Sequence, residues 1–248
     1  MVEDLSILDR KANPPDLTLT YGKELDQVAD VRYGLRGAQL PLVVVVHGGF
    51  WKPQYDRAHA EAMSSALAQA GWTVLTLEYR RVPGQPDATL DDMAQALAAL
   101  PAKVEQHNGK LLLLGHSAGG HLVLWAAARR AAPQLQGVIA LAPAADLRLA
   151  HRLQLSEGAV QRFLGVDPAE RPDADPMRLP APAVAVSIVQ GALDQVVPPA
   201  VAHSYCGAFP ETRLVELADT GHFALIDPAT RAWPVVVEEL RRLSARIF

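Results

Sequence analysis

The stretch that decides the fold is residues 111–130, which read LLLLGHSAGGHLVLWAAARR. It opens with four leucines, a run typical of a strand that is buried on both faces of a sheet. Three glycines follow within residues 115–120 and suit a sharp change of chain direction. The apolar residues and alanines from 118 to 130 predict a helix. The stretch therefore predicts a strand, a tight turn and a helix in direct succession.

Short apolar runs alternate with helical patterns on both sides of this stretch. The alternation predicts an α/β fold, with a mostly parallel central sheet and helices on both of its faces. The predicted main strands are residues 42–46, 72–77, 111–114, 138–141, 184–189 and 213–217, and two weaker strands, 17–20 and 28–32, are expected to be antiparallel at the first edge. The predicted helices are residues 59–70, 90–106 with an interruption at Pro101, 118–130, 199–209 and 234–247.

The length of 248 residues suits one domain covering 1–248, because α/β domains commonly exceed 200 residues. Residues 157–164 have a short helical pattern, and residues 167–182 are rich in proline. We therefore expect the chain around 146–182 to form a small cap-like excursion over the carboxyl edge of the sheet.

Composition excludes several classes of function. Half of the residues are hydrophobic and the net charge is −4, with lysine and arginine scattered along the chain, which argues against nucleic-acid binding. No apolar run has the length of a membrane span, and the first residues lack a signal-peptide pattern, so we expect a cytoplasmic protein. The single cysteine, Cys206, lies in a helical pattern and is expected to be a packing residue.

Ser117 stands at the centre of the turn, in the pattern G-x-S-x-G. Between a strand and a helix, this pattern projects the serine Oγ clear of the sheet. Gly115 and Gly119 suit the turn because a Cβ at either position would collide with neighbouring backbone. A glycine-rich turn with an incidental serine is the alternative. We predict that Ser117 is a nucleophile.

Residues 47–51, HGGFW, follow the first main strand. Two glycines there let backbone N–H groups approach a substrate carbonyl. We expect the N–H groups of Gly49 and Ala118 to form an oxyanion hole, with Gly48 or Phe50 as a third donor. His47 would hold the loop in shape through hydrogen bonds to backbone.

The same loop supplies candidate pocket residues. Phe50 and Trp51 are expected to shape a substrate pocket together with the cap-like excursion, and His116 to line it. His116 and His121 are equally typical of local packing. The charged run 78–81, EYRR, contributes to the rim of the site or stabilises the loop above it.

His222 is the candidate base, because it follows the last predicted strand and precedes the final helix. Asp194, after the strand 184–189, is the candidate acid, and the order Ser, acid, His suits this architecture. Competing residues are Asp146 and Asp219 for the acid and His203 for the base. Asp219 is more typical of a turn.

The chain resembles the α/β-hydrolase superfamily over nearly its whole length. More narrowly, residues 47–51 and 115–121 resemble the bacterial esterase/lipase group that includes the kynurenine formamidases (arylformamidases). Residues 21–22, 27, 30–31 and 78–80 echo the same group. The resemblance implies an α/β-hydrolase fold and a triad of Ser117, Asp194 and His222.

We therefore expect a serine carboxylesterase that acts on a small or medium ester or amide through an acyl-enzyme. An arylformamidase and a peptidase would use the same groups, and a non-catalytic binding protein is the alternative of another class. No HExxH pattern or His/Cys cluster predicts a metal, and no cofactor is expected. A monomer and a homodimer both stay open.

Overall fold

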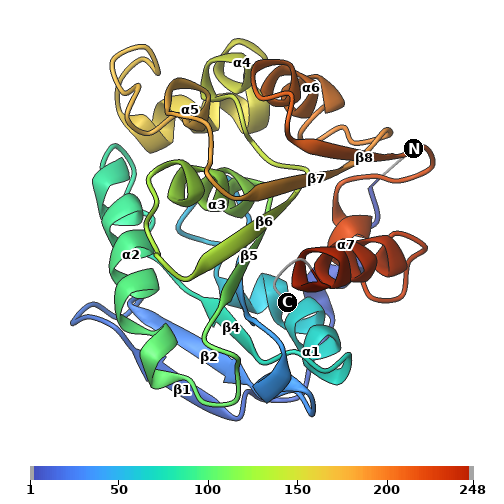
Figure 1. Cartoon of the computed structure of the whole chain (residues 1–248). Coiled ribbons are helices and arrows are strands. Elements are labelled where there is room, and N and C mark those ends of the chain that lie inside the picture. Colours follow the sequence, from blue (N-terminus) through green and yellow to red (C-terminus); the bar gives the residue numbers. More distant parts are fainter. Residues whose placement is uncertain (1–2, 246–248) are drawn as a thin grey trace.

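The computed structural model describes residues 3–245 and contains one eight-stranded sheet (Figure 1). Its strand order is β1-β2-β4-β3-β5-β6-β7-β8. The strands are β1 (Leu17–Thr20), β2 (Val28–Arg32), β3 (Leu42–Val46), β4 (Val74–Leu77), β5 (Leu111–His116), β6 (Leu135–Leu141), β7 (Ala185–Gly191) and β8 (Arg213–Leu217). The first two strands are antiparallel to their neighbours and the others are parallel, which confirms the predicted sheet.

Helices cover both faces of the sheet. The α-helices are α1 (Glu61–Gln69), α2 (Pro86–Ala99), α3 (Ala118–Ala128), α4 (Leu147–Arg152), α5 (Leu155–Leu164), α6 (Pro199–Ala208) and α7 (Trp233–Ala245). The 3₁₀ turns are η1 (Ser6–Asp9), η2 (Gly37–Gln39), η3 (Arg57–Ala60), η4 (Pro101–Lys103), η5 (Pro176–Arg178) and η6 (Phe223–Ile226). Among residues 3–245, no helix combines the length and the apolar character that crossing a membrane requires.

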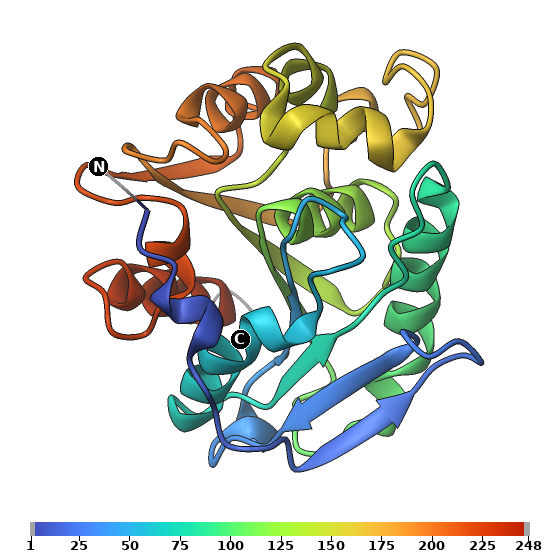
Figure 2. The ribbon, with the colours of Figure 1, turned by 180° about the vertical axis from the view of Figure 1, so that it is seen from behind.

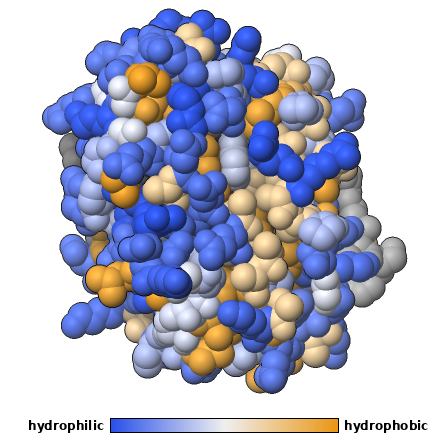
Figure 3. All heavy atoms as spheres, turned by 90° about the vertical axis from the view of Figure 1, so that its left-hand side faces the viewer, coloured by the Kyte–Doolittle hydropathy of each residue, from blue (hydrophilic) through white to orange (hydrophobic). Residues whose placement is uncertain are grey.

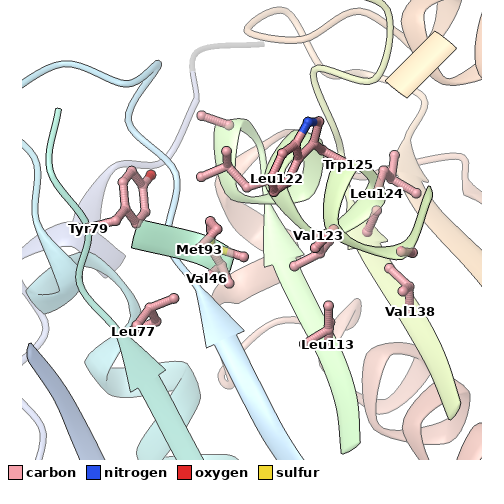
Figure 4. Packing of buried hydrophobic residues seen from close by; sticks show 14 of the residues in the cluster. Val46, Leu77, Tyr79, Met93, Leu113, Leu122, Val123, Leu124, Trp125 and Val138 are labelled. Carbon is pink, nitrogen blue, oxygen red and sulfur yellow. The ribbon is translucent and has the colours of Figure 1, made fainter. Parts of the chain in front are cut away.

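Successive residues of β3 face opposite layers of helices, because side chains alternate along a strand. Val44 and Val46 pack in the apolar cluster that includes α2 and α3. Val43 and Val45 pack in the other cluster, with α1 and α7. Figure 4 shows the first interface, where Leu122 and its neighbours in α3 lie over the strands. A strand buried on both sides accounts for the continuous run of valines.

The predicted helix 90–106 is wrong in its extent. Helix α2 begins at Pro86, which suits the first helical position because its missing N–H needs no partner there. It ends at Ala99, and Pro101 starts the short turn η4 instead. Buried Met93 and Leu97 face the sheet, whereas Asp91 is exposed.

The face of the molecule in Figure 3 is largely hydrophilic, with a band of apolar residues across it.

Residues 146–182 contain α4, α5 and η5 and lie beyond the carboxyl end of β6 (Figure 1). Gln154, Ser156 and Glu157 have positive φ angles of 52°, 48° and 58°, so the chain turns sharply between α4 and the regular part of α5. The organisation of the chain as a single domain with a cap stays a prediction. The predicted last helix, 234–247, corresponds to α7, and its residues 246 and 247 lie outside the described residues.

Candidate active site

Ser117 lies between β5 and α3 in a strained backbone conformation, with φ 56° and ψ −116°. Non-glycine residues rarely have such a positive φ, so the surrounding chain must hold it. Its N–H donates to the carbonyl of Leu141 at 2.8 Å, and its carbonyl accepts from His121 and Ala144, each at 3.1 Å. These bonds fix the turn at the carboxyl end of the sheet.

The glycines of the turn are required by close backbone contacts. A Cβ on Gly115 would overlap the carbonyl of Gly119. A Cβ on Gly119 would overlap the carbonyl of Val46 at the end of β3. A Cβ at either position would therefore collide with backbone, as predicted. Its absence lets β5, α3 and β3 approach one another closely beside Ser117.

His222 and Asp194 form a buried pair. The Nδ1 atom of His222 is 2.7 Å from Oδ2 of Asp194, and both side chains are almost fully buried. The backbone N–H groups of Val196 and Val197 donate to the other carboxylate oxygen, each at 2.8 Å. With Oδ1 occupied in this way, Oδ2 accepts from Nδ1–H, which leaves Nε2 of His222 as an acceptor.

Ser117 and His222 line the same pocket. Within residues 3–245 their side chains make no direct hydrogen bond. Catalytic hydrogen bonds of this kind are often long before substrate binds. The structure thus brings the three predicted triad residues to one place, with the contact between His222 and Asp194 already formed.

The competing residues lie elsewhere in the fold. Asp146 caps the N-terminus of α4 by accepting from the N–H of Leu149 at 2.8 Å, and it also accepts from Ser204. Asp219 is exposed. His203 lies on α6, with Nε2 2.7 Å from a carboxylate oxygen of Glu216.

The predicted oxyanion loop lies against the turn at Ser117. A Cβ on Gly48 would lie 3.0 Å from the Cβ of Ser117, so the small residue allows the two backbones to approach. Gly49 has a φ of 109°, which favours glycine. In the part of the chain that the structure describes, the N–H groups of Gly49 and Ala118 donate to no protein acceptor.

His47 holds the loop from inside the protein. Its Nδ1 is 2.8 Å from the carbonyl of Gly48, and its Nε2 is 3.0 Å from Oε1 of Glu78. Its ring stacks on Tyr79 with 4.4 Å between centroids, and the Tyr79 hydroxyl donates to the His47 carbonyl at 2.9 Å. His47 therefore contacts the loop backbone and does not line the pocket.

Glu78 is the centre of a buried charged cluster. Its carboxylate accepts from His47, from the backbone N–H of Arg57 at 2.8 Å and from the Arg81 guanidinium. Burial raises the pKa of this carboxyl, but the hydrogen bond to His47 and the nearby positive charges outweigh it and lower the pKa to about 2. Of the two roles expected for residues 78–81, the contacts favour stabilisation of the loop.

The pocket beside Ser117 has a volume of about 200 Å³. Its apolar surface includes Phe50 and Phe223. Of the three predicted pocket residues, Phe50 and His116 line it. The complete lining is Leu5, Leu8, Gly49, Phe50, Tyr55, His59, His116, Ser117, Ser156, Val196, His222 and Phe223.

Trp51 does not line this pocket but lines a neighbouring one together with Phe50 and Phe163, so its place in the substrate pocket stays a prediction. It is buried, stacks on Phe163 of α5 at 4.6 Å and meets the edge of His121 at 5.2 Å. Phe50 and Trp51 both have positive φ angles, 50° and 55°. Their rings meet edge to face with 6.3 Å between centroids; Phe50 reaches the pocket beside Ser117, and Trp51 packs against the cap-like excursion.

Two further histidines lie close to His222. His116 is buried with Nε2 3.2 Å from the His222 carbonyl, and the two rings lie 4.4 Å apart. His59 lines the pocket 5.9 Å from the His116 ring. Burial, above all, lowers the pKa of His59 to about 4 and that of His116 well below its ordinary value. Both rings are therefore neutral at pH 7.

Sequence reasoning missed His59, Tyr55 and the N-terminal leucines of the pocket. His59 carried one signal, its position shortly after the HGGFW loop in a predicted helix. Leu5 and Leu8 carried none, because nothing local indicates where an N-terminal segment will pack. Residues 3–245 include no group of three or more His, Cys, Asp or Glu side chains that could hold a metal ion.

Residues 34–206 match the BD-FAE family model. Esterase LipC of Mycobacterium tuberculosis is 28% identical over 242 residues, which cover 84% of this chain and 60% of that protein. The probable carboxylic ester hydrolase LipM of the same organism is 33% identical over 101 residues, which cover 39% of this chain and 23% of that protein. The chain thus spans less than two thirds of the length of these relatives.

Solved structures share the fold. Esterase B of Lactobacillus rhamnosis superposes with a TM-score of 0.77 at 19% identity, over 97% of this chain and 89% of that one. A putative thioesterase of Silicibacter sp. TM1040 superposes with a TM-score of 0.72 at 22% identity, over 94% and 88%. The family match covers more than half of the chain. The chain has the α/β-hydrolase fold and belongs to the BD-FAE family.

Proposed function

We propose that the protein is a carboxylic ester hydrolase that uses Ser117 as nucleophile, His222 as general base and Asp194 as the acid of the triad. The observation that carries the proposal is the arrangement at the pocket. A buried His222–Asp194 pair, 2.7 Å apart, opens onto the same pocket as a serine held in a strained turn. The likeness to Esterase LipC supports the same chemistry.

The first step forms the acyl-enzyme. Ser117 Oγ attacks the ester carbonyl carbon while Nε2 of His222 takes the hydroxyl proton. The carbonyl electron pair moves onto oxygen, and the N–H groups of Gly49 and Ala118 stabilise that negative charge, with Gly48 or Phe50 beside them. The carbonyl then re-forms, the C–O bond to the alcohol breaks, and His222 returns the proton to the departing oxygen.

The second step releases the acid. Water attacks the acyl carbon, His222 takes its proton, and the bond to Ser117 Oγ breaks as the proton returns to the serine. Asp194 orients the ring throughout and stabilises the imidazolium. Since His59 and His116 are neutral at pH 7, the positive charge formed on His222 meets no cationic neighbour in these two rings.

The pocket supports substrates of small to medium size. A volume of about 200 Å³ lined by Phe50, Phe223 and other apolar side chains suits a short acyl or aryl group. Residues 146–182 act as a small cap in this proposal, since Ser156 of α5 lines the pocket. The Ser156 hydroxyl accepts a hydrogen bond from the ammonium group of Lys52, in the loop after β3. This bond connects the cap to the oxyanion loop.

The test compares three proteins on a short-chain aryl acetate and on an N-formyl aromatic amine. Wild type and the control Ser65→Ala, on α1 away from the pocket, should hydrolyse the ester, whereas Ser117→Ala should lose about 10⁶ in turnover. A reactive organophosphonate should add its mass to wild type and Ser65→Ala only. Equal activity of Ser117→Ala and wild type would refute the nucleophile. Faster cleavage of the formamide than of the ester would favour the arylformamidase.

A further inference from the structure

The N-terminal segment, residues 3–10, packs along the chain that carries His222 (Figure 2). Both carboxylate oxygens of Glu3 accept from the backbone N–H of His222, at 2.9 and 3.0 Å. A Cβ on Gly221 would lie 2.6 Å from Glu3 Oε2, so glycine makes room for this contact. Two residues 219 positions apart in the sequence therefore meet at the base of the proposed triad.

The other end of the segment is fixed as well. The Arg10 guanidinium donates to both oxygens of Asp227, at 2.6 and 3.0 Å. Asp227 follows η6, and His222 precedes it, so the two contacts lie on either side of that turn. Between them, Ile7 is 3% exposed and packs in the apolar cluster of α1 and α7. Three contacts of different kinds thus hold residues 3–10 in one position.

Leu5 and Leu8 project from this segment into the pocket. Leu5 precedes η1 and Leu8 lies in it, and residues three apart share one face of a 3₁₀ turn. Leu5 is 52% exposed, which is a large apolar surface to leave against solvent beside Ser117. An apolar substrate group that covers this surface would gain roughly fourfold in binding for each methylene removed from water.

We propose that residues 3–10 form one side of the active-site pocket and that Leu5 and Leu8 set the size of the apolar acyl group that is accepted. This inference rests on the proposed ester hydrolysis. Glu3 is a positioning residue in this arrangement: it holds the leucines in place and fixes the backbone of His222, without contact to the substrate.

The experiment measures kcat/KM on aryl esters with acyl chains of two, four, six and eight carbons. Leu5→Trp fills the pocket and should lower the ratio of the eight-carbon to the two-carbon ester by about tenfold, a size of effect that hydrophobic pockets reach for one methylene. Leu5→Ala opens the pocket and should raise the same ratio. The matched controls are Leu25→Trp and Leu25→Ala, at a leucine that is 95% exposed in the β1–β2 connection, and they should leave the ratio at its wild-type value.

Glu3 is tested by the same ratio. Glu3→Ala removes both acceptors and should raise the ratio as Leu5→Ala does, because the segment loses its contact to His222. Glu3→Gln retains one carbonyl acceptor and should recover most of the wild-type ratio. Circular dichroism and thermal melting of each variant identify any that fail to fold. Because Leu5 is exposed, substitutions there are expected to change the stability least.

The outcomes separate the two proposals. Opposite shifts for Leu5→Trp and Leu5→Ala, with unchanged controls, support the inference. Active variants whose chain-length ratios all equal that of wild type would overturn it and leave the ester hydrolase intact. A wild type that cleaves none of the four esters and does not react with the organophosphonate would overturn both, since there would be no acyl group to select.

Discussion

Replacing Glu78 by glutamine tests how the oxyanion loop is held. The carboxylate is 2% exposed and contacts His47, the Arg57 N–H and Arg81. Lowering its pKa from the ordinary 4.5 to about 2 corresponds to about 3 kcal/mol of stability at pH 7, since one pKa unit is about 1.4 kcal/mol. Breaking a buried ion pair by removing one partner costs about 3–5 kcal/mol, so two independent arguments agree.

The assay is urea unfolding of wild type, Glu78→Gln and the control Glu238→Gln, followed by tryptophan fluorescence. At pH 7 we expect Glu78→Gln to lose about 3 kcal/mol. Glu238, on the exposed side of α7 with its carboxylate 4.0 Å from Arg241, should lose no more than about 0.5 kcal/mol. Activity of Glu78→Gln on the short ester should fall with stability, because the loop carrying Gly49 loses its support.

The pH dependence has a defined sign. The pKa of Glu78 is lower in the folded protein than in the unfolded chain, so its contribution is complete above pH 4.5 and disappears as the pH falls through 4.5 toward 2. The stability difference between wild type and Glu78→Gln should therefore shrink over that range. A difference that stays constant down to pH 3, or a loss no larger than that of Glu238→Gln, would refute the reasoning.

Three further predictions concern Asp194, the turn at Ser117 and the pocket. Asp194→Asn should lower kcat on the aryl ester by about 10⁴ with little change in KM, because the His222 tautomer is no longer fixed; an unchanged kcat would contradict the triad. Gly119→Ala should lower the melting temperature or abolish folding through overlap with the Val46 carbonyl, whereas Gly207→Ala, whose Cβ meets open space, should melt like wild type. The folded-state pKa of His59 is lowered to about 4, so protons favour the unfolded chain below pH 6.5, and His59 alone should account for up to about 3 kcal/mol of the stability that wild type loses between pH 6.5 and 4. Denaturation of His59→Gln should show a smaller loss over that range, and an equal loss would contradict the burial argument.

Local patterns were sufficient for the sheet and for the turn at Ser117. The valine run of β3 and the leucine run of β5 are short, and the β3 run is β-branched, which favours strands covered on both faces over buried helices. That Ser117, Asp194 and His222 lie close together could also be predicted. Each follows a predicted strand, and the carboxyl ends of parallel strands meet at one edge.

The rest of the pocket depends on properties that a local pattern does not contain. Two successive left-handed residues, Phe50 and Trp51, place Phe50 beside Ser117 and Trp51 against Phe163 of α5, and no local pattern predicts such φ angles. The contact of Glu3 with His222 joins positions 219 residues apart. Such contacts follow from the packing of the finished fold, and they decided which side chains surround Ser117.

The backbone of Ser117 has a consequence for attempts to make this protein more heat-resistant. A non-glycine residue at φ 56° and ψ −116° costs on the order of 1–3 kcal/mol, whereas glycine adopts positive φ readily. A library screened only for survival at high temperature would thus enrich glycine at position 117. The most heat-resistant clones would be those that had lost the hydroxyl, so selection for durability at this residue would remove the nucleophile of the proposed mechanism.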